Sequence, residues 1–206
     1  MHFFDFEKKM VDYPVFTVQE VKNIFFDETN LSVQTSQWVK KGYLERIKKG
    51  LYILSNRKKE INPMVLAEKI YSPSYLSLEF ALNHYGIIPD IPGTYTSVSS
   101  RKTMNFKTNF GYFSYQKIKP EFFIGYQPLI EKDVSFSLAY PEKAILDFLY
   151  LNKRRLKADP AFWNEMRIDE DFRFDKKQIE FYKRIFRDKK VDILIDSLLE
   201  YQKNAR

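Results

Sequence analysis

The sequence predicts an α+β fold with two parts, a small N-terminal domain over residues 1–58 and a larger domain over residues 63–206. Two short helix patterns followed by a hairpin pattern lie within the first 54 residues. Strand-like alternation then fills the middle of the chain, and helical periodicity returns after residue 152. We therefore expect a mixed α/β core over residues 63–152, a helical tail over 153–206, and a polar linker around residues 55–63.

The N-terminal domain opens with two helix signals. Thr17 and Glu20 stand three residues apart, as in a capping box, and predict a helix over residues 18–26. A second helix is predicted over residues 33–41, with Ser32 as its N-cap. A short helix before Pro14 is also expected.

A basic hairpin follows the second helix. The apolar stretches 44–47 and 51–54 flank Lys48, Lys49 and Gly50, which is the pattern of two short strands joined by a turn. Two helices and a cationic hairpin in this order predict a winged helix-turn-helix. In such a domain the second helix enters the major groove of DNA, and we expect the hairpin to touch the flanking backbone.

Positive charge is concentrated in this hairpin region. Residues 40–59 carry a formal net charge of +7, which equals that of the whole chain, whereas residues 1–39 carry −3. Such a segment favours binding to a polyanion. Gln can pair with adenine and Lys can neutralise phosphate. The predicted DNA-binding residues are Gln34, Gln37, Lys40, Lys41, Arg46, Lys48 and Lys49. Each lysine taken singly could equally be a solvated residue at a helix end.

The second domain is predicted to alternate helices and strands. Expected helices cover residues 63–71 and 78–85, the latter capped by Ser77, and another begins at Pro141. Expected strands cover residues 94–100, 110–118, 122–125 and 134–139. In the tail, helices are expected over residues 176–186, capped by Asp175, and 191–201.

Composition excludes several classes of protein. The chain has no cysteine, so disulfides, thiol catalysis and cysteine zinc sites are excluded. No apolar run approaches 18 residues, and the first residues lack the features of a signal peptide. We expect a cytoplasmic protein that does not associate with membranes.

Enzyme signatures are weak. The densest acidic cluster, residues 169–171, is not preceded by the Gly-Ser turn of a nucleotidyltransferase. Phosphate-binding glycine motifs are absent, and the only two histidines are His2 and His84. We expect no catalytic residues, no bound metal and no cofactor.

Several motifs together resemble the AbiEi-type antitoxins. The matching segments are YLSLEFALNHYG at 75–86, VSSR at 98–101, AYPEKAILD at 139–147, WVKKGYL at 38–44 and KGLY at 49–52. The resemblance covers about residues 15–152. The chain departs from the family at Leu78, where members often have glycine or a polar residue.

The resemblance implies a dual function. AbiEi-like proteins are bacterial and cytoplasmic, repress their own operon through the winged helix, and act in phage defence. Their C-terminal domain counteracts a nucleotidyltransferase-like toxin, with no stable complex expected. The duplex DNA partner should be an inverted repeat in the protein's own promoter, bound by two copies.

We expect the functional surface of the antitoxin domain to include Arg101, Lys143 and Asp147, with the last two exposed on the helix that begins at Pro141. Because Lys143 and Asp147 are spaced i, i+4, they could instead be an ordinary structural pair.

Two other functions stay open. The protein could be a transcription factor whose second domain senses a small molecule, which would require an apolar pocket within residues 63–152. It could also be a nucleic-acid-processing enzyme.

Overall fold

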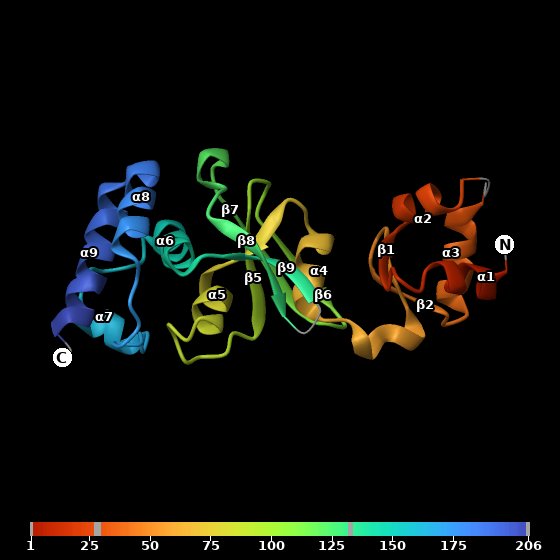
Figure 1. Ribbon diagram of the computed structural model, residues 1–206, viewed down its shortest axis with the longest axis horizontal. Coiled ribbons are helices and arrows are strands. Elements are labelled where there is room, and N and C mark those ends of the chain that lie inside the picture. The colour runs from red at the N-terminus through yellow and green to blue at the C-terminus, as the bar shows by residue number, and fades with distance from the viewer. Residues whose placement is uncertain (1, 27–29, 132–133, 205–206) are drawn as a thin grey trace.

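The computed structural model describes residues 2–26, 30–131 and 134–204 of the chain. It is a mixed α+β fold, as expected. Figure 1 shows three groups of elements along the long axis: a small helical unit with its own sheet at the N-terminal end, a larger sheet in the middle, and helices at the C-terminal end.

The N-terminal unit combines three helices with a small antiparallel sheet. Its elements are α1 (Phe3–Lys9), β1 (Val15–Thr17), α2 (Val18–Ile24), α3 (Leu31–Lys40), β2 (Leu44–Lys48) and β3 (Leu51–Leu54). The strand order is β1-β3-β2. Phe6, Phe16 and Trp38 are buried at the centre of its core.

Local signals predicted most of this unit. The capping box of α2 is present, because the Thr17 hydroxyl accepts from the Glu20 N–H at 3.1 Å and Glu20 accepts from the Thr17 N–H at 2.6 Å. The predicted start of the next helix is wrong: α3 begins at Leu31, and Ser32 lies in its first turn. Leu31 is buried in the core, so the earlier start covers an additional apolar side chain. Strand β1 was not predicted.

The second unit is built on a six-stranded sheet with the order β6-β7-β5-β4-β9-β8. Its strands are β4 (Ser74–Leu76), β5 (Thr94–Ser99), β6 (Met104–Thr108), β7 (Gly111–Lys117), β8 (Tyr126–Glu131) and β9 (Val134–Ala139). Its helices are α4 (Pro63–Ile70), α5 (Leu78–His84), the short η2 (Pro120–Phe122) and α6 (Pro141–Asn152).

The sequence missed β4 and β6 and misplaced one strand. The strand expected at 122–125 is wrong, since Phe122 ends η2 and the partner of β9 is β8. The Phe122 ring is buried and stacks on Phe186 with centroids 4.6 Å apart, so tertiary packing holds this segment outside the sheet.

The C-terminal helices complete the main core. They are α7 (Pro160–Glu165), which was not predicted, α8 (Lys176–Phe186) and α9 (Lys189–Asn204). Asp175 caps α8 as predicted, accepting from the Lys177 N–H at 2.8 Å. Trp163 and Leu194 are buried in the same cluster as the sheet, so the tail is part of that core.

The two units share apolar contacts across the small sheet. Val15, Leu51 and Ile53 of β1 and β3 belong to the core of the second unit. The expected linker is ordered as the 3₁₀ helix η1 (Ser55–Glu60).

Polar contacts also cross the junction. Glu20 pairs with Lys69 at 3.2 Å, and Glu45 accepts from the Asn109 amide at 2.6 Å. The N-terminal unit is therefore held against the larger one. None of the helices in the described ranges is long and apolar enough to cross a membrane.

Candidate functional site

Helix α3 presents a polar, cationic face, as the sequence predicted. Gln37 and Lys40 are exposed, whereas Thr35 and Trp38 are buried in the N-terminal core. The helix ends in a turn at Gly42, whose φ of +76° suits glycine.

The hairpin extends this basic surface beyond α3. Lys41 follows the helix, Arg46 lies on β2, and Lys49 lies in the turn between β2 and β3; all three are exposed. None of these three residues, nor Lys40, forms an ion pair with another described residue. Four cations are therefore available for a negatively charged partner. We call Gln37, Lys40, Lys41, Arg46 and Lys49 the α3–hairpin surface.

Two of the predicted DNA-binding residues do not belong to this surface. The Lys48 ammonium donates to the backbone carbonyl of Ile70 and lies 5.6 Å from the centre of the Phe106 ring. Burial, together with the charge of Arg101, lowers the pKa of Lys48. Gln34 is half-buried, and its Oε1 is buried with no hydrogen-bond partner among the described residues.

Other cations of the basic segment are also used inside the fold. Lys58 pairs with Glu45 at 3.0 Å, and Arg57 pairs with Glu60 at 2.6 Å. The charge of +7 in residues 40–59 is therefore divided between the junction and the solvent. Tertiary contacts decide which of these cations are paired within the fold and which are exposed to solvent. The spacing of the charges in the sequence does not show this.

Lys143 and Asp147 were expected to be exposed, and that expectation is wrong. Both side chains are completely buried on α6. The Lys143 ammonium donates to Asp147 and to the Tyr75 hydroxyl, the latter at 2.8 Å. Tyr75 and Ser77 in turn donate to Asp147, at 3.0 and 2.9 Å. We call these four residues the Lys143 network.

Burial dominates the electrostatics of this network. It lowers the pKa of the Lys143 ammonium and raises that of the Asp147 carboxyl, while the ion pair opposes both shifts. Burial and the Asp147 charge raise the pKa of Tyr75. Each polar group of the network has a partner, as a buried ion pair requires. The network therefore fastens α6 to β4 through Tyr75 and to the residue just after this strand, Ser77.

Ser77 acts differently from the prediction. It precedes α5, but its side chain makes no capping bond and donates to Asp147 instead. The next residue, Leu78, has a φ of +58°, in the left-handed region that favours glycine. Leucine therefore adopts this conformation at a cost that glycine would avoid.

Arg101, the third residue expected on the functional surface of the second domain, is exposed. Its guanidinium donates to the Ser72 carbonyl at 2.9 Å and lies 4.9 Å from the centre of the Tyr71 ring. Arg101 is therefore near Lys48 at the junction of the two units, and it is not brought together with Lys143 and Asp147.

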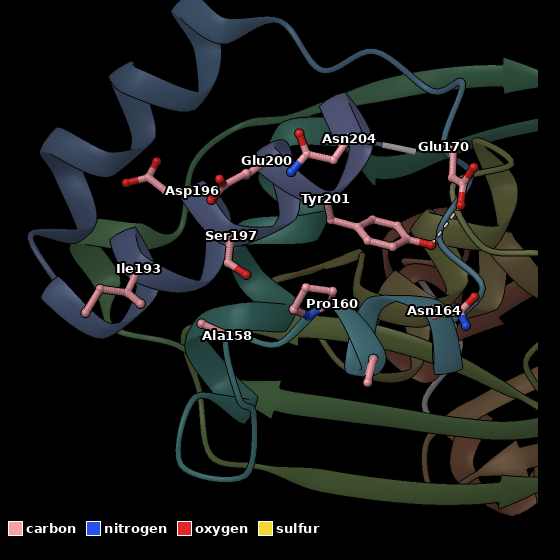
Figure 2. Close-up of a pocket in the computed structure, with 11 residues that line it drawn as sticks. Ala158, Pro160, Asn164, Glu170, Ile193, Asp196, Ser197, Glu200, Tyr201 and Asn204 are labelled. Atoms are coloured by element: carbon pink, nitrogen blue, oxygen red, sulfur yellow. Dashed lines mark hydrogen bonds between the residues drawn. The ribbon is translucent and has the colours of Figure 1, made fainter. Parts of the chain in front are cut away.

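The tail contains a hollow of about 960 Å³ between α7 and α9 (Figure 2). Glu170, Asp196 and Glu200 line it, and Glu170 accepts a hydrogen bond from Tyr201 at 3.0 Å. Asp196 is paired with Lys183 at 2.9 Å. None of the residues predicted from sequence to carry function lies in this hollow.

A second hollow, of about 770 Å³, lies over β5, β6 and β7. Its lining is rich in hydroxyl, amide and charged side chains, so it is not the apolar pocket that the small-molecule sensor hypothesis requires. Sequence reasoning missed it because its residues come from five separate segments.

No group of three or more His, Cys, Asp or Glu in the described part of the chain is arranged to hold a metal ion. No family model matches the chain, and no curated protein matches it.

Proposed function

We propose that this protein is a cytoplasmic DNA-binding repressor of its own promoter and the antitoxin of a nucleotidyltransferase-like toxin in phage defence. Its N-terminal unit is a winged helix-turn-helix, and two copies bind an inverted repeat. The observation that carries the DNA-binding part is the α3–hairpin surface, where four exposed cations flank the amide of Gln37.

The order of elements supports this assignment. Helices α2 and α3 are followed directly by the β2–β3 hairpin, and α3 keeps its apolar face in the core. In helix-turn-helix proteins the second helix places side chains against base edges while cations bind phosphates. The antitoxin part rests on the motif resemblance over residues 75–147.

The DNA-binding proposal is tested with Lys40→Ala/Lys41→Ala/Lys49→Ala. Binding to a duplex carrying the protein's own promoter should weaken, and the slope of log K against log salt should flatten by about one unit per lysine removed. Fluorescence anisotropy over a range of salt concentrations measures both quantities, and footprinting should reveal two protected half-sites on neighbouring turns.

The matched control is Lys157→Ala/Lys177→Ala/Lys190→Ala, which removes the same charge from exposed lysines of the tail. It should leave the slope unchanged. Gln37→Ala should instead reduce the preference for the specific sequence, by about 1–3 kcal/mol if the amide pairs with a base. Equal effects of the two triple variants would contradict the proposal.

The antitoxin part is tested by co-expression with the product of the neighbouring gene. The triple variant of the α3–hairpin surface should still protect cells, because neutralisation is assigned to the second unit. Loss of protection in this variant, with its fold intact by circular dichroism, would assign neutralisation to DNA binding. Failure of the full chain to protect would reject the antitoxin part.

A further inference from the structure

The hollow over β5, β6 and β7 is an open, polar face of the sheet. On β7, Tyr112, Ser114 and Gln116 line it and alternate with Phe113 and Tyr115, which are buried. Strands β5 and β7 are parallel, a pairing that usually has both faces covered by helices. Here the second face carries hydrogen-bonding side chains beside apolar ones such as Leu78, Phe106 and Leu151.

Two cations flank this face. Lys107 on β6 and Arg155 after α6 line the hollow, are exposed, and form no ion pair with another described residue. The Lys107 ammonium lies 5.5 Å from the centre of the Tyr112 ring, which is 51% exposed. The hollow thus combines an accessible aromatic ring with two positive charges.

Unused hydrogen-bonding groups complete the lining. The amides of Asn105 and Gln116 and the hydroxyl of Ser114 make no side-chain hydrogen bond within the described ranges. Glu79 is the one acidic residue of the lining. Amides and a carboxylate can pair with the edge of a base or with ribose hydroxyls, and an aromatic ring can stack on a base.

We infer that this hollow binds a nucleotide, either free or within a single-stranded nucleic acid, in addition to the duplex contact assigned to the N-terminal unit. Tyr112 stacks on the base, Lys107 and Arg155 contact phosphate, and Asn105 and Gln116 contact base or ribose. The volume of about 770 Å³ is in the range of sites for small ligands.

The test uses the full chain carrying Lys40→Ala/Lys41→Ala/Lys49→Ala, so that the α3–hairpin surface does not contribute. The probe is fluorescein-labelled single-stranded octauridylate, with UTP as competitor. Adding Lys107→Ala/Arg155→Ala should weaken binding at least about tenfold and flatten the salt slope by about 1.4 units, as expected for two phosphate contacts on a single strand.

The matched control is Lys117→Ala/Arg154→Ala. Both residues are exposed and neighbour the hollow in sequence, but neither lines it. This variant should bind within about twofold of its parent. Tyr112→Ala should weaken binding by about tenfold, whereas Tyr112→Phe, which keeps the ring, should not.

Competition by UTP at a similar affinity would identify a free nucleotide as the ligand, and weak competition would identify a strand. Absence of binding by the parent chain, equal losses in the two double variants, or no effect of Tyr112→Ala would overturn the inference. The proposed repressor function would survive these outcomes, because its assay uses duplex DNA and residues of the N-terminal unit.

Discussion

At the scale of single residues, the Lys143 network places an ammonium and a carboxylate inside the core. Removing one member of a buried pair leaves the other charged and unpaired, which costs far more than the pair itself contributes. The network also joins residues about 70 positions apart in the sequence, since Tyr75 and Ser77 contact Asp147. It therefore fixes one arrangement of α6 against the sheet.

We expect Lys143→Met to lower the free energy of unfolding by about 3–5 kcal/mol, because Asp147 loses its only cationic partner in the network. Adding Asp147→Asn should restore at least about 1 kcal/mol, since the amide oxygen still accepts from Ser77 and Tyr75 and no charge remains buried. Urea unfolding at neutral pH measures both changes.

The control is Arg167→Met, which breaks the exposed pair of Arg167 and Asp90 at 3.4 Å and should change the unfolding midpoint little. If the stability losses of the single variants Lys143→Met and Asp147→Asn simply added up in the double variant, the two groups would not stabilise each other.

At the scale of elements, the start of α9 depends on one side chain. Asp188 accepts from the N–H groups of Lys190 and Val191, at 3.1 and 3.3 Å, and pairs with Lys153. Burial alone would raise the pKa of Asp188, but these bonds hold it below its usual value. A lowered carboxyl pKa stabilises the fold above the pKa of the unfolded chain, near 3.8, and this stabilisation disappears as the pH falls through the folded value.

We therefore expect Asp188→Asn to be less stable than the natural chain at pH 7, because asparagine keeps the cap but loses the ion pair. The difference should begin to shrink as the pH falls below about 3.8, the value of the unfolded chain, and should vanish only below the lower pKa of the folded chain, where the carboxyl is protonated in both states. Urea midpoints measured from pH 7 down to pH 2.5 give this curve.

Asp192→Asn on the same helix is a control with the opposite sign. Burial raises the pKa of Asp192, so its ionised form costs stability as the pH rises through the folded value. The Asp192→Asn variant should therefore become more stable relative to the natural chain as the pH rises toward neutrality. A parallel pH dependence in the two variants would contradict these assignments.

At the scale of the whole molecule, the junction joins two units that the sequence suggested were independent. Val15, Leu51 and Ile53 are buried in the core of the larger unit, and Lys48 reaches the carbonyl at the end of α4. The α3–hairpin surface is therefore carried on a unit packed against the sheet, at the end of the molecule opposite α7, α8 and α9 (Figure 1).

We expect a fragment of residues 63–206 to fold, because it keeps the six-stranded sheet and the tail helices. It should be less stable than the full chain, since each of the three lost apolar side chains contributes about 1.5–3 kcal/mol when fully buried. Thermal unfolding followed by circular dichroism compares the two. Equal melting temperatures would show that the junction contributes nothing to stability.

Features that depend on neighbours along the chain could be predicted from sequence. The capping box of Thr17 and Glu20, the cap at Asp175 and the alternation along β7 all follow from contacts within a few residues. The exposed face of α3 follows in the same way from helical periodicity, which placed Gln37 and Lys40 outside and Trp38 inside.

Only the tertiary structure decided which charges are buried. Local spacing presents Lys143 and Asp147 as a surface pair, and Lys48 as one more cation of a hairpin. Contacts with Tyr75, Ile70 and other residues distant in the sequence bury the first two and turn Lys48 toward the second unit.

The hollow over the sheet was beyond sequence reasoning for the same reason. Lys107 and Tyr112 belong to one hairpin, but Glu79 and Arg155 are far from it along the chain, and the four residues carry no common spacing. The sequence by itself determined the α+β class and the elements with strong local signals, because short-range hydrogen bonds and periodicity encode them. The pairing of distant strands and helices decided which side chains meet, since that depends on the packing of the whole core.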